Sequence, residues 1–200
     1  MRSLSRVLSR LGIRYERYRI FEFRIASGLQ AEPRGPVHIA PVDRRVLETS
    51  EADEIRALAS YAGSEALGFG AFVEGKVVAA CWYWFGERYR GRGFIELPPR
   101  AAKLVQVTTA ADWRRRGLAA SLIEASAQLM ATHGFELLYA RVWHSHTASA
   151  SAFLKAGWRE CEVITTLRLP ILKRPLRFST RRTTPHALNV GLARLNGTSP

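Results

Sequence analysis

Three arginines and a glycine stand immediately before an apolar helical pattern in the sequence DWRRRGLAASLIEA, residues 112–125. The stretch follows a predicted strand, KLVQVTT at 103–109, and opens a predicted helix over 114–132. A helix N-terminus carries unpaired backbone N–H groups and a partial positive charge, and a glycine lets a ligand approach the backbone. Arginine adds fixed charge and forked donors. Residues 114–119 therefore predict an anion site, most often a phosphate site, although a solvated basic turn would have the same sequence.

Alternating strand and helix patterns surround this stretch. Strands are predicted at 37–43, 136–143 and 158–167, helices at 43–60 and 147–156, and a hairpin at 68–85 with Glu74 and Gly75 in its turn. A short strand is also predicted at 94–97, after a polar loop at 88–93. Strand–helix–strand–helix–strand order implies parallel crossovers, and the hairpin makes the sheet mixed. The sequence thus predicts an α/β fold with a single mixed sheet flanked by helices.

Two segments resemble the GCN5-related N-acetyltransferase (GNAT) superfamily. The pyrophosphate loop of that family has the pattern Gln/Arg-x-x-Gly-x-Gly/Ala at the start of its main helix, and RRRGLA at 114–119 is similar to it. FLKAGW at 153–158 resembles the Tyr-x-Lys-x-Gly-Phe ending of the last helix of the family. Two positions depart from these patterns: Phe153 stands where many relatives have tyrosine, and His146 replaces a frequent asparagine.

The resemblance covers residues 37–166 and implies the acyl-CoA N-acyltransferase fold. In that fold a mostly antiparallel sheet contains one parallel pair of strands that splays at a bulge. Acyl-CoA would lie with its pyrophosphate over the amides of 115–120 and its pantetheine arm along the strand edge at 107–109, as an added strand does. The implied cofactor-binding residues are Val107, Thr108, Thr109, Arg114, Arg115, Arg116, Gly117, Leu118, Ala119, Ala120, His146 and Phe153.

Direct acyl transfer would need a base for the attacking amine and a proton for the departing thiolate. Phe153 cannot donate a proton, so another group serves or the thiolate leaves unassisted. His146, His144 and Glu96 are the predicted catalytic residues. Each has an alternative structural role: the histidines as exposed loop or helix-capping residues, and Glu96 as a surface strand end.

The net charge of +13 is concentrated at the two ends of the chain. Residues 1–35 hold eight arginines and three glutamates, and residues 166–200 hold seven basic residues and no acid. The predicted division is a basic extension at 1–36 with an amphipathic helix and a strand-like segment, an acyltransferase domain at 37–167, and a basic, partly disordered tail at 168–200. The ends could contact an anionic membrane surface or anionic polymer, or nucleic acid, or could reflect only an arginine-rich bacterial composition.

The hydropathy of the chain and its two cysteines bear on where the protein works and what it binds. No run of eighteen apolar residues predicts a membrane-spanning helix. Cys81 and Cys161 lie in apolar runs, which favours buried thiols in a reducing compartment, and they show no metal-ligand spacing with the histidines. We expect a cytoplasmic N-acetyltransferase that uses acetyl-CoA or another acyl-CoA, no metal, and an unidentified amine acceptor, with peripheral membrane contact left open. The alternatives are a non-catalytic acyl-CoA-binding or membrane-associated module and a basic nucleic-acid-binding protein.

Overall fold

The computed structural model describes residues 14–25, 37–91, 94–172 and 174–181. The elements in chain order are β1 (Arg14–Arg24), β2 (His38–Val42), α2 (Arg44–Glu48), α3 (Asp53–Arg56), the 3-10 helix η1 (Ala57–Tyr61), β3 (Ala66–Val73), β4 (Lys76–Trp84), α4 (Gly86–Arg90), β5 (Ala101–Thr109), the 3-10 helix η2 (Ala111–Trp113), α5 (Leu118–Thr132), β6 (Leu137–Trp143), α6 (Thr147–Lys155), β7 (Arg159–Arg168) and β8 (Leu176–Arg181).

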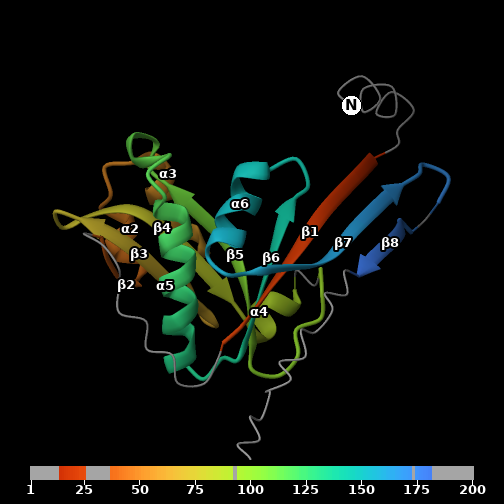
Figure 1. Ribbon diagram of the computed structural model, residues 1–200, viewed down its shortest axis with the longest axis horizontal. Coiled ribbons are helices and arrows are strands. Elements are labelled where there is room, and N and C mark those ends of the chain that lie inside the picture. The colour runs from red at the N-terminus through yellow and green to blue at the C-terminus, as the bar shows by residue number, and fades with distance from the viewer. Residues whose placement is uncertain (1–13, 26–36, 92–93, 173, 182–200) are drawn as a thin grey trace, which may run out of the picture.

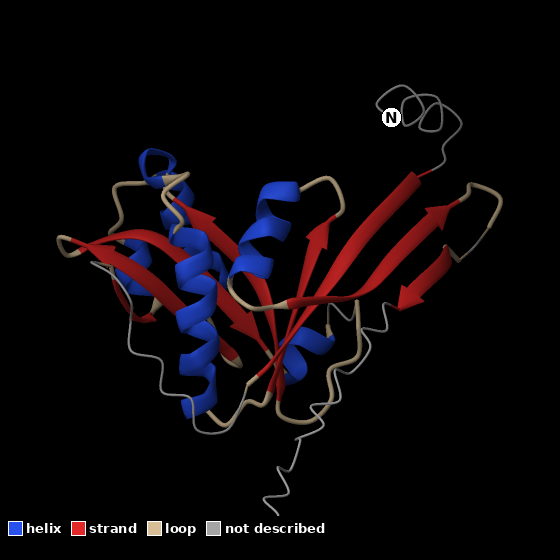
Figure 2. Ribbon diagram, in the orientation of Figure 1, coloured by secondary structure: helices blue, strands red, loops and turns tan. Residues whose placement is uncertain are grey.

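The strands form one eight-stranded sheet in the order β2-β3-β4-β5-β6-β1-β7-β8. Every neighbouring pair is antiparallel except β5 and β6, which are parallel and are joined through the crossover helix α5. In Figures 1 and 2 the strands fan out in two groups, β2–β5 on one side and β6, β1, β7 and β8 on the other. The predicted mixed, mostly antiparallel sheet with one parallel pair flanked by helices is confirmed.

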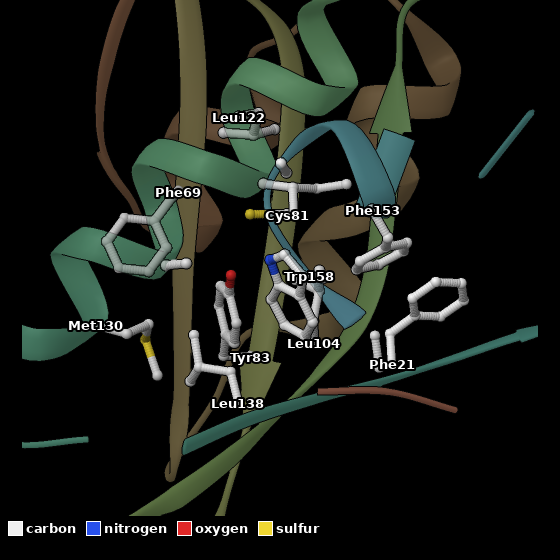
Figure 3. Close-up of a cluster of buried hydrophobic side chains, with 14 of the residues drawn as sticks. Phe21, Phe69, Cys81, Tyr83, Leu104, Leu122, Met130, Leu138, Phe153 and Trp158 are labelled. Carbon is white, nitrogen blue, oxygen red and sulfur yellow. The ribbon is translucent and has the colours of Figure 1, made fainter. Parts of the chain in front are cut away.

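The helices cover the two faces of the sheet unequally. Helices α5 and α6 lie across one face, where Leu122 and Met130 of α5 are fully buried against Phe69 and Tyr83 (Figure 3). On the opposite face, a smaller cluster packs α2, α3 and η1 against Trp82. Tyr83 and Trp82 are neighbours in β4, so their side chains point to opposite faces, as the alternation of a strand requires. Both are core residues.

Strand β1 lies inside the sheet, between β6 and β7. It pairs with β6 from Tyr18 to Arg24 and with β7 from Arg14 to Glu22. Its alternating sequence RYERYRIFEFR buries Ile20 and Phe21 on the two faces, while its arginines are partly or fully exposed. The predicted division of the chain at residues 36 and 168 stays a prediction, but β1 and β8, which it assigns to the two ends, are strands of the same sheet as the rest.

A β-bulge opens the sheet between β5 and β6. Along β4, Trp82 pairs with Gln106 and Tyr83 with Leu104, so Val105 is an extra residue on β5. Strand β5 pairs with β6 only as far as Leu104. Because a bulge bends its own strand, β5 turns away from β6 at this point, and the carboxyl ends of the two strands diverge (Figure 1). We call the space between the diverging ends the splay.

Some sequence predictions differ from the structure. Residues 94–97 form no strand, so that prediction is wrong, and the predicted polar loop begins inside helix α4. The predicted helix 43–60 is interrupted at 49–52 because Ser50 Oγ accepts from the backbone N–H of Ala52 and turns the chain. The predicted helix at 114–132 begins only at Leu118, since Gly117 has a φ of +81°. The predicted N-terminal helix and the end of the tail lie outside the described residues.

Within the described part of the chain, no helix has the length and apolar character needed to span a membrane.

Candidate functional site

The N-terminus of α5 presents a row of backbone donors. The N–H groups of residues 115–119 have no hydrogen-bond acceptor among the described residues, whereas those of Ala120 and Ser121 both donate to Gly117 O. Arg115 and Gly117 have φ angles of +63° and +81°, so the backbone turns twice before the helix begins. Five successive free N–H groups at a helix N-terminus form an arrangement that favours an anion.

The three arginines of this turn have different surroundings. Arg114 is held in place, because its Nε donates to Thr109 O at 3.1 Å and its Nη2 lies 3.6 Å from Glu54 Oε1. The Arg116 guanidinium lies 4.6 Å from the centroid of the Trp113 ring. Arg115 is exposed and forms no ion pair with a described residue. Arg115 is therefore the guanidinium of the three that is most available to a ligand.

Glu54 fixes this turn from the opposite side of the sheet. Its carboxylate accepts from Ala111 N at 2.7 Å. Backbone hydrogen bonds, followed by the Arg114 charge, lower the pKa of Glu54, so the carboxylate stays ionised and keeps the turn anchored. No local sequence pattern indicates this role of Glu54, because its contact with Ala111 joins positions 57 residues apart.

A cavity of about 370 Å³ lies beside this turn, between the N-terminus of α5 and the side of α6. On the side of α6, the cavity is lined by three small side chains and one cation: Ala148, Ser151, Ala152 and Lys155. Its other wall contains predicted cofactor residues; these are Thr109, Arg114, Arg115, Gly117, Leu118, Ala119 and Ala120. Arg116 and Thr108 are not among the lining residues.

The open edge of β5 leads from this cavity into the splay. Ala110 N donates to Val78 O of β4 at 2.9 Å, so by alternation the N–H groups of Val107 and Thr109 point away from β4. No strand pairs with β5 there, because β6 has already diverged. The Arg114 side chain already donates a hydrogen bond to the Thr109 carbonyl on this edge. No side chain of the described residues donates to the Val107 carbonyl. An extended ligand with amide groups could therefore pair with this edge.

The splay holds a second cavity of about 380 Å³ between β5, β6 and α6. It is lined by Lys103, Leu104, Val105, Gln106, Val107, Arg141, Val142, Trp143, His146, Ser149 and Phe153. His146 is exposed and stands at the N-cap of α6, where its side chain makes no capping hydrogen bond. The structure thus brings His146, Val107 and Phe153 together, as expected for a single site.

Phe153 forms part of the floor of the splay. It is 6% exposed, its ring stacks on Phe21 at a centroid distance of 5.3 Å, and it meets Trp158 edge-on at 5.1 Å (Figure 3). The position that carries a tyrosine in many relatives is here an apolar packing position at the edge of the cavity.

His144 and Glu96 lie elsewhere. His144 is half-buried, its backbone N–H donates to Arg17 O at 2.9 Å, and it does not line the splay cavity. Glu96 is exposed and lines a different cavity of about 910 Å³, at the opposite end of β5. The splay also contains two cations that were not predicted from the sequence, Lys103 and Arg141. The described residues contain no group of three or more His, Cys, Asp or Glu side chains placed to hold a metal ion.

Comparison with known proteins agrees with this architecture. The family model described as "Acetyltransferase (GNAT) family" matches residues 32–158. The chain belongs to the GNAT acetyltransferase family. The match contains β5, the bulge, the turn at 114–119 and α6, so these elements lie within the GNAT domain.

Several solved structures share the GNAT fold of this chain. They include a GNAT-family structure from Colwellia psychrerythraea (TM-score 0.55, 16% identity, 78% of this chain and 57% of the other), one from Kribbella flavida (0.53, 16%, 84% and 64%) and one from Novosphingobium aromaticivorans (0.52, 19%, 85% and 66%). The chain thus spans between 57% and 66% of the length of these structures. A search of curated proteins found no match.

Proposed function

We propose that this GNAT protein is an acyl-CoA-dependent N-acyltransferase that transfers an acetyl group from acetyl-CoA to an amine. The observation that carries the proposal is the continuous path from five free N–H groups at 115–119, along the open edge of β5, into the splay. This path offers in sequence what acetyl-CoA requires: donors for a pyrophosphate, a strand edge for the pantetheine amides, and a cavity for the acyl group.

The cofactor residues follow from that path. The pyrophosphate would accept from the free N–H groups of 115–119, with Arg115 adding charge from the exposed side. The pantetheine arm would pair with Val107 and Thr109 and pass the small α6 residues Ala148 and Ala152. The thioester would then lie in the splay, beside His146 and Phe153. No metal takes part in this proposal.

In the proposed reaction the amine nitrogen attacks the thioester carbonyl carbon, a C–N bond forms, and the C–S bond breaks. The amine gives up one proton to a base, and His146 is the titratable side chain of the cavity best placed to receive it, directly or through water. Phe153 supplies no proton, so CoA leaves as the thiolate or takes its proton from solvent. His144 and Glu96 are weaker proposals, because neither lines the splay.

The proposed location is the cytoplasm. Cys81 and Cys161 are both free thiols, as expected in a reducing compartment. A contact of the basic ends, 1–36 and 168–200, with an anionic membrane or polymer remains a proposal; of these ends the structure describes 14–25, 168–172 and 174–181.

Calorimetric titration of acetyl-CoA tests the cofactor site. We expect micromolar binding to the wild type and at least about 100-fold weaker binding to Gly117→Glu, because the new carboxylate would stand among the N–H groups meant for the pyrophosphate. Gly134→Glu is the matched control. Gly134 has a φ of +82° against +81° for Gly117, a Cβ at either position meets nothing within 4 Å, and Gly134 follows the other end of α5.

The outcomes separate the proposed functions. Binding that Gly117→Glu loses and Gly134→Glu keeps supports the cofactor site, and release of free thiol with an amine then distinguishes an enzyme from a non-catalytic acyl-CoA-binding module. Phe153 is the observation that favours the module, since it removes the usual proton donor. Absence of binding of acetyl-CoA, CoA and longer acyl-CoAs to the wild type would refute the proposed function.

A further inference from the structure

Three cations surround the ring of Phe94 on the face of the sheet opposite α5 and α6. The Arg141 guanidinium carbon lies 4.3 Å from the ring centroid, that of Arg177 4.8 Å, and Lys103 Nζ 5.9 Å. Arg177 also donates from Nη2 to Phe94 O at 2.7 Å, which ties strand β8 to this ring. We call Phe94, Lys103, Arg141 and Arg177 the cationic wall.

Only part of the cationic wall lies in the splay, because Phe94 and Arg177 line the cavity of about 910 Å³. Lys103 and Arg141 line the splay cavity. Their strand neighbours Leu104 and Val142 belong to the core under α5 and α6. Because neighbouring residues of a strand point to opposite faces, Lys103 and Arg141 reach the cavity from the other face. A molecule that enters the splay from the face opposite the proposed acetyl-CoA path therefore passes these cations.

Among the described residues, the two arginines of the wall form no ion pair. No carboxylate of the described residues lies within 4.0 Å of a nitrogen of Arg141 or Arg177. Glu96 lines the same cavity as Phe94 and Arg177, and Glu16 is close enough to Tyr18 that, after burial, it raises the pKa of that hydroxyl. A guanidinium stacked on an aromatic face keeps its in-plane N–H donors free for a ligand.

The two arginines come from distant parts of the chain. Arg141 lies in β6 and Arg177 in β8, and Phe94 from the segment before β5 holds both against its ring. Arg141 also lies 4.6 Å from the centroid of the Tyr18 ring of β1, so its guanidinium has an aromatic contact on a second side. These contacts hold two forked donors in fixed positions, as the binding of a planar or tetrahedral anion requires.

We propose that the acceptor of this enzyme is a small amine that also carries an anionic group, a carboxylate or a phosphate, bound by Arg141 and Arg177. This inference rests on the proposed function, since it assigns the acceptor of the same site. The anion would anchor the acceptor at the cationic wall and leave its amine free to enter the splay. Acceptors with several positive charges would be repelled by the same wall.

A comparison of matched acceptors tests the chemical class. Thiol release is measured with acetyl-CoA and a panel of L-amino acids, each beside its own amide, and with phosphoethanolamine beside ethanolamine. We expect kcat/KM to be at least about 10-fold higher for the anionic member of one pair, because a charge-assisted hydrogen bond contributes that much or more. The amino acids test the carboxylate and phosphoethanolamine tests the phosphate. Equal or higher rates with every neutral member would overturn the proposal.

Charge-removing variants test the residues. Arg141→Gln and Arg177→Gln should each raise the acceptor KM about 10- to 100-fold with kcat changed less than about threefold, since they remove binding and not chemistry. Arg45→Gln is the control, on the exposed face of α2 and without an ion pair within the described chain. Acetyl-CoA affinity should not change in any of the three. An unchanged acceptor KM in Arg141→Gln and Arg177→Gln would overturn the assignment.

A binding measurement separates this inference from the proposed function, because it needs no acetyl-CoA. In protein labelled with 15N-arginine, phosphoethanolamine and the preferred amino acids should shift the side-chain Nε signals of Arg141 and Arg177, with ethanolamine as the neutral control. Signals that move only with the anionic compounds support the cationic wall even if acetyl-CoA fails to bind. Signals that stay fixed in wild-type protein would refute it even if acetyl-CoA binds.

Discussion

His146 and His144 are two positions apart, yet the structure gives them different surroundings. His146 is exposed at the start of α6 and lines the splay cavity. His144 is half-buried beside β1, where its backbone N–H is bonded to Arg17 O. The reacting amine would therefore meet His146 and not His144. Variants of the two histidines therefore test whether His146 is the base, and each variant serves as the control for the other.

Replacement of His146 by alanine should lower kcat about 100-fold, because a positioned general base typically contributes that factor or more. The free energy of unfolding should change by less than about 0.5 kcal/mol, since the His146 side chain makes no capping hydrogen bond. His144→Ala should retain kcat within about threefold. Steady-state kinetics with urea unfolding of both variants provides the measurement. A larger loss of kcat in His144→Ala would reverse the assignment.

The residue types at the anion turn were predictable from sequence, but their individual roles were not. The anion turn at Gly117 follows from a local pattern of strand, glycine and helix, whereas the open edge at Val107 was predicted only from the resemblance to the GNAT family. That Arg114 is tied to Glu54 depends on a contact across 60 residues of chain, which no local pattern contains. Lys103 and Arg141 were missed for the same reason: each looks like an ordinary strand cation until Phe94 is placed over them.

Among the elements, β1 carries a nearly buried carboxylate, Glu22, that contacts two arginines. The Glu22 side chain is 8% exposed, accepts from Arg159 Nη2 of β7 at 2.6 Å and from Arg24 Nε at 3.1 Å, and faces Tyr139 of β6 in the register of the sheet. Glu22 thereby connects the inserted strand to both of its neighbours. Without the Arg159 side chain, the nearly buried Glu22 carboxylate would keep only Arg24 as an ion-pair partner, and the Arg24 side chain is mostly exposed to solvent.

A double-mutant cycle on this pair measures that contribution. Arg159→Met should lower the free energy of unfolding by about 1–2 kcal/mol. This loss is smaller than for a fully buried ion pair because the Arg159 side chain is half-exposed and solvent screens its charge. Combined with Glu22→Gln, the loss should be smaller than the sum of the single losses by about 1 kcal/mol. Urea unfolding of the four proteins gives the coupling free energy.

The exposed pair of Arg100 and Glu136 is the matched control for this cycle. Both side chains are about 60% exposed, so Arg100→Met should cost less than about 0.5 kcal/mol. Equal losses in Arg159→Met and Arg100→Met would show that Glu22 does not connect the strands as the geometry indicates.

Most strands were predictable from the sequence, but the strands they pair with in the sheet were not. Alternation of apolar and polar residues predicted a strand at 17–25, and β1 is there. Nothing in that alternation indicates that it lies between β6 and β7, because pairing partners more than a hundred residues away leave no local pattern. The short strand β8 was missed because all its residues are exposed, so it lacks the alternation that reveals a half-buried strand.

At the scale of the whole molecule, buried and half-buried protonated side chains should lower the stability of the fold at alkaline pH. Burial raises the pKa of Cys81 to about 12, that of Cys161 to about 11 and that of Tyr139 to about 12. The unfolded chain releases the thiol protons near pH 9, while the folded protein retains them. The unfolded state therefore binds fewer protons above that pH, and the free energy of unfolding falls as the pH rises from about 9 toward 11–12.

Replacement of Cys81 by alanine should reduce this pH dependence. Each group contributes a slope of up to about 1.4 kcal/mol per pH unit between its unfolded and folded pKa, so the variant should lose less stability than the wild type between pH 9 and pH 10.5. At pH 8 the variant should be less stable by about 1 kcal/mol, because it loses a buried sulfur. Urea unfolding under reducing conditions at several pH values checks this. Parallel curves for the two proteins would contradict the assignment.

The place of β1 in the sheet also fixes an order of events during synthesis. The 112 residues at positions 25–136 separate the end of β1 from the beginning of β6, its first partner along the chain. At about 5–20 residues per second, a ribosome needs roughly 6–22 s to produce them. Throughout that interval the apolar residues of β1 and both of its edges lack their native partners. The nascent chain therefore offers an early binding segment to ribosome-associated chaperones, and the half of the sheet that contains β1 closes only after β6, β7 and β8 have been made.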